Sequence, residues 1–235
     1  MNATNNSAVI SHKSMGFTLA ETLITLVVIG VIAALTVPSL IQKHRAEEFE
    51  TRFKKAISIL NSAVNYYKFD TGEDMTVENA TETRFKDVIR KHFQIMEDCG
   101  VTKCFDNAKP PYRNYANNAD ISRAYFNEGV FVLNDGMTIF IDQDSTDLAL
   151  SVDINGYWKK PNRYGYDVFT FPIATKTSNY NSQSIKGRGK VLPGGHPYTR
   201  YNDSLCSKTS SNAINGIACA YQATQNQNYF KELMY

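Results

Sequence analysis

Residues 16–38 read Gly-Phe-Thr-Leu-Ala-Glu-Thr-Leu-Ile-Thr-Leu-Val-Val-Ile-Gly-Val-Ile-Ala-Ala-Leu-Thr-Val-Pro. From Phe17 to Val37 this segment is apolar apart from its threonines and one carboxylate, Glu21. A helix needs about 20 apolar residues to cross the hydrocarbon core of a bilayer, so the segment predicts a membrane-spanning helix. An ionisable side chain inside such a helix is energetically costly and therefore points to a function.

The apolar helix is expected to continue beyond Pro38 as an amphipathic helix. Apolar residues recur there at spacings of three and four, with one longer gap, as one helical stripe requires. They are Leu40, Ile41, Phe49, Phe53, Ile57, Leu60, Val64 and Tyr67. Gly72 is suited to ending the helix in a left-handed cap. The second half of this helix must be covered by a domain, while the first half is left for lipid or for sister helices.

Two simpler interpretations of the segment compete. A secretory signal peptide has a shorter apolar region followed by a small-residue cleavage site, whereas this run is longer and contains Glu21. A plain single-pass anchor stays open, because it requires no particular residues at its start. The positive-inside rule expects basic residues on the cytoplasmic side of a span, yet Lys43, His44 and Arg45 follow the span here.

Gly-Phe-Thr-Leu-x-Glu before an apolar helix resembles the N-terminus of type IV prepilins and of the pseudopilins of type II secretion. The resemblance implies cleavage by a prepilin peptidase between Gly16 and Phe17, and N-methylation of Phe17. It also implies that Pro38 is the helix-kinking proline that many type IV pilins carry. The resemblance covers roughly the first quarter of the chain.

Glu21 is expected to set the register of an assembly. Cleavage before Phe17 creates an amino cation at the start of the helix, where the helix dipole favours a carboxylate by roughly 0.3–1 kcal/mol. In hydrocarbon an unpaired charge costs at least about 2.5–3.5 kcal/mol. Pairing with the amine of a neighbouring copy removes this cost, and such a pair specifies register more than it adds stability.

The resemblance implies a structural subunit in the inner membrane, single-pass, with its head outside the cytoplasm. Its partners would be the prepilin peptidase, an inner-membrane assembly platform and other pilin or pseudopilin subunits in a periplasmic or extracellular filament. The predicted parts are a leader (1–16), the membrane and filament-core half of the helix (17–38), its amphipathic half (39–72) and a globular head (73–235). The predicted fold class is α+β, with an antiparallel sheet packed against the amphipathic half-helix.

The head carries the strand signals. Apolar runs at 130–133 and 137–141 flank Asn134-Asp135-Gly136, and Asp-Gly between such runs is a strong hairpin signal. Further strands are predicted at 148–154 and 167–173, which gives an antiparallel sheet of three or four strands. Before them, apolar residues at helical spacing predict a second, shorter helix over residues 83–98.

Four cysteines form two close pairs, Cys99 with Cys104 and Cys206 with Cys219. An even number of cysteines in a chain that leaves the cytoplasm indicates disulfides. The alternative is a zinc site. Neither pair has Cys-x-x-Cys spacing and no histidine lies nearby, so disulfides are the preferred interpretation.

Oxygen-bearing side chains gather between the third and fourth predicted strands, at Asp153, Asn155, Asn162 and Asp167. Such oxygens could surround a hard cation such as Ca²⁺. Asp, Asn, Gly and Pro are also the usual turn formers, and the spacing departs from the EF-hand pattern. We therefore predict a plain turn without a metal or other cofactor, with calcium as the alternative.

The polar loop over residues 175–205 contains a basic cluster, Lys186, Arg188 and Lys190. Cations of this kind could contact nucleic acid phosphates, which makes a minor pilin that binds DNA an alternative function. A solvated loop is the simpler interpretation, since a net charge of +2 gives no global argument for binding to nucleic acid.

The sequence contains no catalytic serine elbow, zinc-protease helix or dinucleotide fingerprint, so we predict that the chain is not an enzyme.

Overall fold

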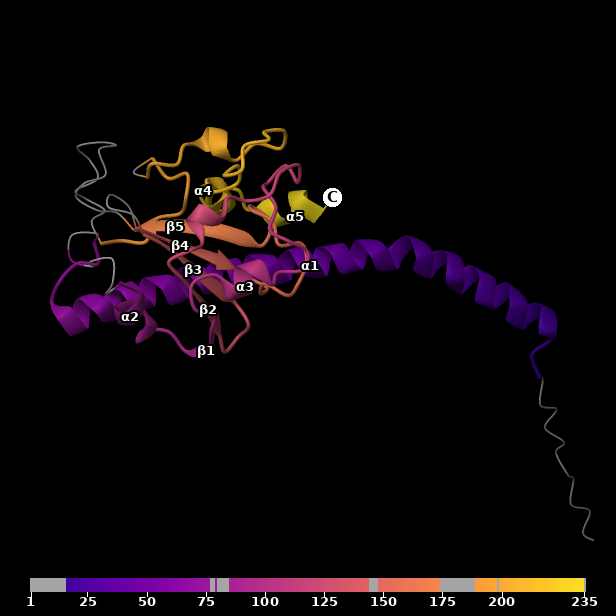
Figure 1. Ribbon diagram of the computed structural model, residues 1–235. Coiled ribbons are helices and arrows are strands. Elements are labelled where there is room, and N and C mark those ends of the chain that lie inside the picture. Colours follow the sequence, from indigo (N-terminus) through magenta and orange to yellow (C-terminus); the bar gives the residue numbers. More distant parts are fainter. Residues whose placement is uncertain are drawn as a thin grey trace, which may run out of the picture. The chain divides into compact units, whose positions relative to one another are not determined.

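The computed structural model describes residues 16–76, 79, 85–143, 148–173, 189–197 and 199–234. The chain divides into two compact units, residues 1–42 and residues 43–235. Helix α1 (Leu19–Thr71) runs through both, so its second half belongs to the same unit as the sheet. The expected α+β fold is confirmed by this helix and by a five-stranded antiparallel sheet (Figure 1).

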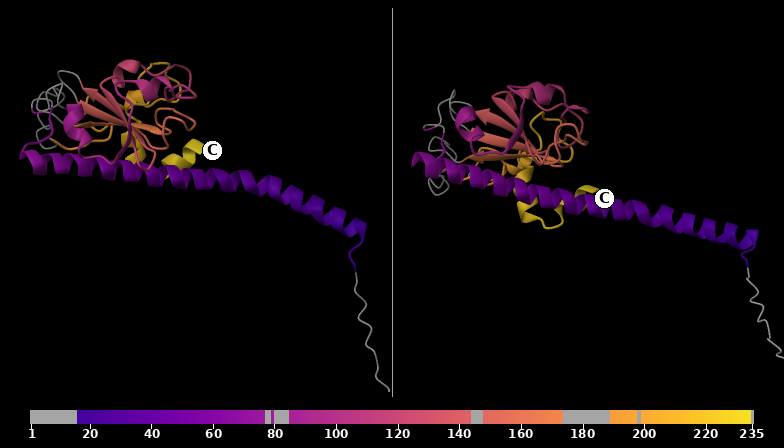
Figure 2. Two further views of the ribbon diagram at one scale, coloured as in Figure 1. Left: turned by 60° about the horizontal axis from the view of Figure 1, so that its bottom comes forward. Right: turned by 90° about the horizontal axis from the view of Figure 1, so that it is seen from below.

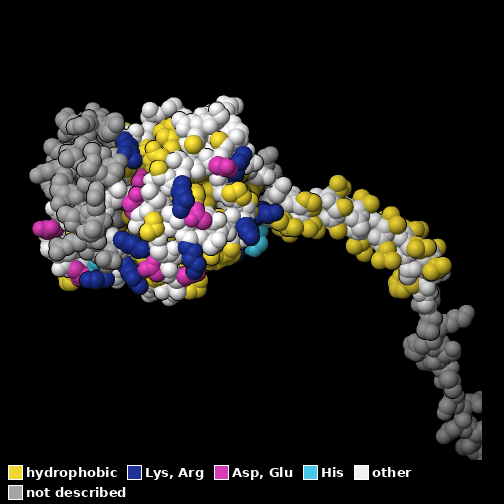
Figure 3. All heavy atoms as spheres, viewed as in Figure 1, with side chains coloured by type: hydrophobic (Ala, Val, Ile, Leu, Met, Phe, Trp, Pro, Cys, Tyr) yellow, Lys and Arg dark blue, Asp and Glu magenta, His cyan; other side chains and the backbone are white. Residues whose placement is uncertain are grey.

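In the first unit, α1 exposes large apolar side chains at positions all along its length, and such side chains cover the face of this half that is drawn in Figure 3. Each large one is at least 46% exposed. They are Leu19, Leu23, Ile24, Leu26, Val27, Val28, Ile29, Val31, Ile32, Leu35, Val37, Leu40 and Ile41. Within the described residues, α1 is the one helix whose length and composition suffice to cross a membrane.

The C-terminal end of α1 lies where the sequence predicts it. Gly72 adopts a φ of 73°, and its N–H donates to the Lys68 carbonyl at 2.9 Å.

The sheet of the second unit follows the order β1-β2-β3-β4-β5, and each strand pairs antiparallel with the next. The strands are β1 (Ile95–Asp98), β2 (Gly129–Leu133), β3 (Thr138–Gln143), β4 (Leu148–Asp153) and β5 (Val168–Ile173). The predicted hairpin joins β2 to β3: the Gly136 N–H donates to the Leu133 carbonyl at 2.9 Å. The Asp135 carboxylate accepts from the Met137 N–H at 3.1 Å and closes the turn.

One face of the sheet packs against the second half of α1 (Figure 2). The helix residues that become buried recur every three or four positions, as the sequence pattern requires. They are Ala46, Phe49, Phe53, Ala56, Leu60, Ala63, Val64 and Tyr67. The ring of Phe53 lies 4.7 Å from that of Phe169 on β5 and 5.5 Å from that of Phe230 on α5 (Tyr229–Met234).

The opposite face of the sheet is also buried, beneath segments that carry α3 (Lys103–Asp106), η1 (Arg123–Tyr125) and η3 (Asp203–Leu205). Helix α4 (Cys219–Gln225) belongs instead to the core on the α1 side, through Cys219 and Ala220. Alternate residues of β2 serve the two faces, with Phe131 on the α1 side and Val130 on the other. Burial on both faces explains why β2 to β5 carry apolar residues on both of their faces. Both expected disulfides are present, Cys99–Cys104 and Cys206–Cys219.

The helix predicted over residues 83–98 is wrong in its second half. Helix α2 covers only Phe85–Arg90, and Ile95–Asp98 is an edge strand that pairs with β2. The apolar residues of this segment fit a helical spacing, but backbone pairing of Ile95 with Leu133 and of Asp98 with Phe131 extends the sheet. Tertiary pairing therefore overrides the local pattern.

Candidate functional site

The first candidate site is the segment that precedes and opens α1. Gly16 and Phe17 lie before the helix, and the Phe17 side chain is 84% exposed. Pro38 lies inside α1 and removes one backbone hydrogen bond there. The predicted leader falls outside the described residues except for Gly16.

Thr18 and Glu21 form a reciprocal cap at the start of α1. The Thr18 N–H and the Thr18 hydroxyl both donate to Glu21 Oε2, each at 2.8 Å. The Glu21 N–H donates to the Thr18 hydroxyl oxygen at 3.3 Å. This is a capping box, which satisfies backbone donors that have no partner within the helix. The carboxylate that we expect to act in assembly therefore also closes the first turn of its own helix.

The second candidate site is the turn between β4 and β5, in the second unit. Asp153 and Asp167 are both fully buried there. Asp153 Oδ1 accepts from the Asn155 N–H at 3.2 Å and from the Gly156 N–H at 2.9 Å. Asp167 Oδ2 accepts from the Asn162 N–H at 2.8 Å, and its Oδ1 accepts from the Arg163 N–H at 2.6 Å. The two carboxylates thus organise the backbone of the turn.

The structure brings all four oxygen-bearing residues of the sequence prediction into this turn. The Asn155 side-chain amide donates to the Lys160 carbonyl at 2.9 Å, and the Asn162 amide donates to the Tyr157 carbonyl at 2.9 Å. Their own Oδ1 atoms are buried, and no group in the described part of the chain donates a hydrogen bond to them. These two oxygens, together with the carboxylates, are the atoms that could hold a hard cation.

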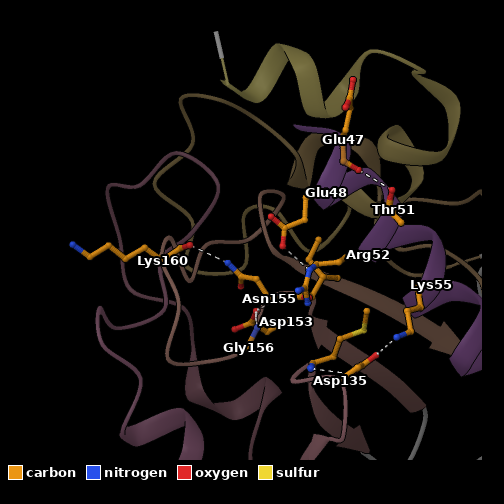
Figure 4. Close-up of polar contacts among 12 residues, drawn as sticks. Glu47, Glu48, Thr51, Arg52, Lys55, Asp135, Asp153, Asn155, Gly156 and Lys160 are labelled. Carbon is orange, nitrogen blue, oxygen red and sulfur yellow. Dashed lines mark hydrogen bonds and ion pairs between the residues drawn. The ribbon is translucent and has the colours of Figure 1, made fainter. Parts of the chain in front are cut away.

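Two residues outside the turn complete it, and the sequence analysis missed both. The Tyr112 hydroxyl donates to Asp153 Oδ2 at 2.8 Å. Arg52 of α1 donates from Nη1 to the Ile154 carbonyl at 3.2 Å, and its Nε donates to Glu48 Oε1 at 2.9 Å. Figure 4 shows Arg52 reaching from α1 to the turn. The turn is therefore tied to the helix.

The charge state of the turn follows from its burial. Burial raises the pKa of Asp153 to about 7, although hydrogen bonds from Tyr112 and from the backbone act in the opposite direction. Burial, and then the charge of Asp153, raise the pKa of Asp167 well above its ordinary range. Among the described residues, neither carboxylate has a Lys, Arg or His partner within 4.0 Å. The pair therefore favours keeping a proton.

The basic cluster of the polar loop falls largely outside the described residues, since only Lys190 is described, and its side chain is exposed. On the face drawn in Figure 3, the Lys and Arg side chains of the second unit are interspersed with Asp and Glu. The described surface in that view thus presents no continuous basic patch.

The comparisons with known proteins bear on the second unit. A protein-family model described as a family of unknown function, DUF6613, matches residues 39–231. No curated protein and no solved structure matches the chain. The matched residues include the amphipathic half of α1, the whole sheet and helices α2 to α4. The chain therefore belongs to the family of unknown function DUF6613.

Proposed function

We propose that the chain is a structural subunit of a type IV pilus or of a type II secretion pseudopilus. In this proposal a prepilin peptidase cuts between Gly16 and Phe17, and the subunit then assembles through α1. The observation that carries the proposal is a single carboxylate, Glu21, in the first turn of α1, where the other large side chains of residues 19–42 are apolar and exposed apart from Gln42.

The exposed apolar side chains of this half-helix must be covered by lipid before assembly and by other helices after it. In a bilayer, lipid covers its apolar side chains, and only packing and polar contacts can favour one helix over lipid as a neighbour. The Glu21 carboxylate is the ionisable group available for this within residues 19–42 of α1. The ammonium group created at Phe17 by cleavage carries the opposite charge. Pairing between copies removes the cost of two isolated charges in hydrocarbon.

The disulfides of the second unit support a location outside the cytoplasm. Both cysteine pairs are oxidised in the structure, and disulfides persist in oxidising compartments. The second half of α1 is fixed to the sheet by the packing of Phe53 against Phe169 and by the hydrogen bond from Arg52 to the Ile154 carbonyl. Such a rigid junction would let a head be carried by a filament built from the first half of the helix.

Assembly of charge-neutral variants in the native host tests the proposal. Glu21→Ala removes both the cap and the charge, whereas Glu21→Gln keeps an oxygen that can accept from Thr18 and removes only the charge. The matched control is Glu48→Gln, a second glutamate on α1 whose pair with Arg52 is solvent-exposed. We expect the sheared filament fraction to fall sharply for both Glu21 variants and to stay at the wild-type level for the control. Normal filament assembly by Glu21→Gln would refute the role in pairing.

A further inference from the structure

The bonds between Thr18 and Glu21 leave the glutamate carboxylate asymmetric. Both donors of Thr18, its N–H and its hydroxyl, converge on Oε2. Within the described residues, no hydrogen bond reaches the other oxygen, Oε1. A carboxylate has about four acceptor positions on its two oxygens. One oxygen of Glu21 is thus occupied within its own chain and the other is available.

The two donors of Thr18 differ in what they require. The N–H bond is a backbone bond that any residue except proline can provide. The hydroxyl instead donates to Oε2 at 2.8 Å while it accepts from the Glu21 N–H at 3.3 Å. Only a side chain with a hydroxyl or a similar group can do both at this position. The side chain of Thr18 therefore decides how firmly the carboxylate is held.

A held carboxylate is a better partner than a mobile one. A free glutamate side chain samples several rotamers, and this freedom is lost when it pairs with a fixed group. Thr18 removes much of that freedom before a second copy arrives, which is preorganisation. The bonds also provide hydrogen-bond donors for a carboxylate at the end of an otherwise apolar helix while the subunit is alone.

We propose that Thr18 is a positioning residue for assembly: its hydroxyl holds Oε2 of Glu21 at the start of α1 and leaves Oε1 for the terminal ammonium of an adjoining copy. This inference rests on the proposed function and adds a specific role for a side chain that does not itself contact the partner.

The test compares three variants of the full chain in the native host. Thr18→Val has nearly the same shape but lacks the hydroxyl, whereas Thr18→Ser keeps the hydroxyl and should rescue. The matched control is Thr25→Val, because the Thr25 hydroxyl only donates to the Thr22 carbonyl of the same helix at 2.9 Å. Filament yield is measured per processed subunit. Crosslinking with the membrane-permeable dicyclohexylcarbodiimide then reports contact between the Glu21 carboxylate and the Phe17 amine of another copy, identified by mass spectrometry.

We expect Thr18→Val to lower both filament yield and the Glu21–Phe17 crosslink by about two- to thirtyfold, the range that corresponds to losing a threonine cap. Thr18→Ser and Thr25→Val should stay near wild type. Wild-type yield and crosslinking for Thr18→Val would overturn the inference, and so would a Thr18→Val chain that remains uncut, because the residue would then act in processing. If Glu21→Gln assembles normally, the pairing of Glu21 with the terminal ammonium fails, whatever Thr18 does, whereas a wild-type chain that forms no filaments would refute the proposed function itself.

Discussion

Replacing Phe53 by alanine is expected to destabilise the second unit strongly, because this side chain joins α1 to the sheet and to the C-terminal helix. It is 2% exposed. Its ring centroid lies 4.7 Å from that of Phe169 and 5.5 Å from that of Phe230, and the ring of Phe171 lies 5.9 Å away. Truncating a buried phenylalanine costs about 3–5 kcal/mol. Each kcal/mol lowers the Tm of a domain of this size by about 2–4 °C, so a fall of about 6–20 °C is expected.

The matched control for this variant is Phe69→Ala, since Phe69 lies on the same helix but is 85% exposed. Substitutions at exposed positions change stability by about 0.5 kcal/mol or less, so its Tm should stay within about 2 °C of wild type. The melting of the full chain in detergent is followed by the fluorescence of Trp158, the single tryptophan, which lies in the second unit. Equal Tm values for the two variants would contradict the packing of α1 against the sheet.

Three further outcomes concern the turn between β4 and β5, all measured by the same melting assay. Gly156→Ala should lower Tm by more than the control Gly100→Ala, although both glycines have positive φ. A Cβ at Gly156 would lie 2.5 Å from the Gly136 carbonyl oxygen, whereas a Cβ at Gly100 would have no atom within 4 Å. Equal losses of Tm would show that the clash at Gly156 is relieved. Burial raises the pKa of Asp153 from 3.8 to about 7, so the stability that this carboxyl contributes is present at acid pH and lost as pH rises through about 7. Wild type should therefore lose Tm relative to Asp153→Asn between about pH 4 and about pH 7, and a constant difference would contradict the burial argument. Because the carboxylates already accept backbone hydrogen bonds, chelation of divalent cations should leave Tm unchanged, and a fall that Ca²⁺ restores would establish the metal alternative.

The strands of the head differ in how far they could be predicted. Strands β2 to β5 are largely apolar and bounded by turn residues, and burial on both faces of the sheet accounts for their composition. Strand β1 has only four residues, and its pattern continues the helical spacing of α2. Its conformation depends on pairing with β2, which is distant in sequence and invisible to a local pattern.

The candidate sites show the same division between local and distant information. The spacing from Thr18 to Glu21 is a capping box that can be recognised in the sequence. The four oxygen-bearing residues of the β4–β5 turn could also be recognised. Tyr112 lies 41 residues from Asp153, and Arg52 lies 102 residues from Ile154. No periodicity or spacing encodes contacts between residues so far apart.

The intact mass of the chain purified from membranes of its native host tests the proposed processing without any substitution. The proposal predicts a chain that begins at Phe17, carries a methyl group on its terminal nitrogen and is recovered with other copies in sheared filaments. A chain that still begins at Met1 and is extracted only as a membrane-bound monomer would contradict it.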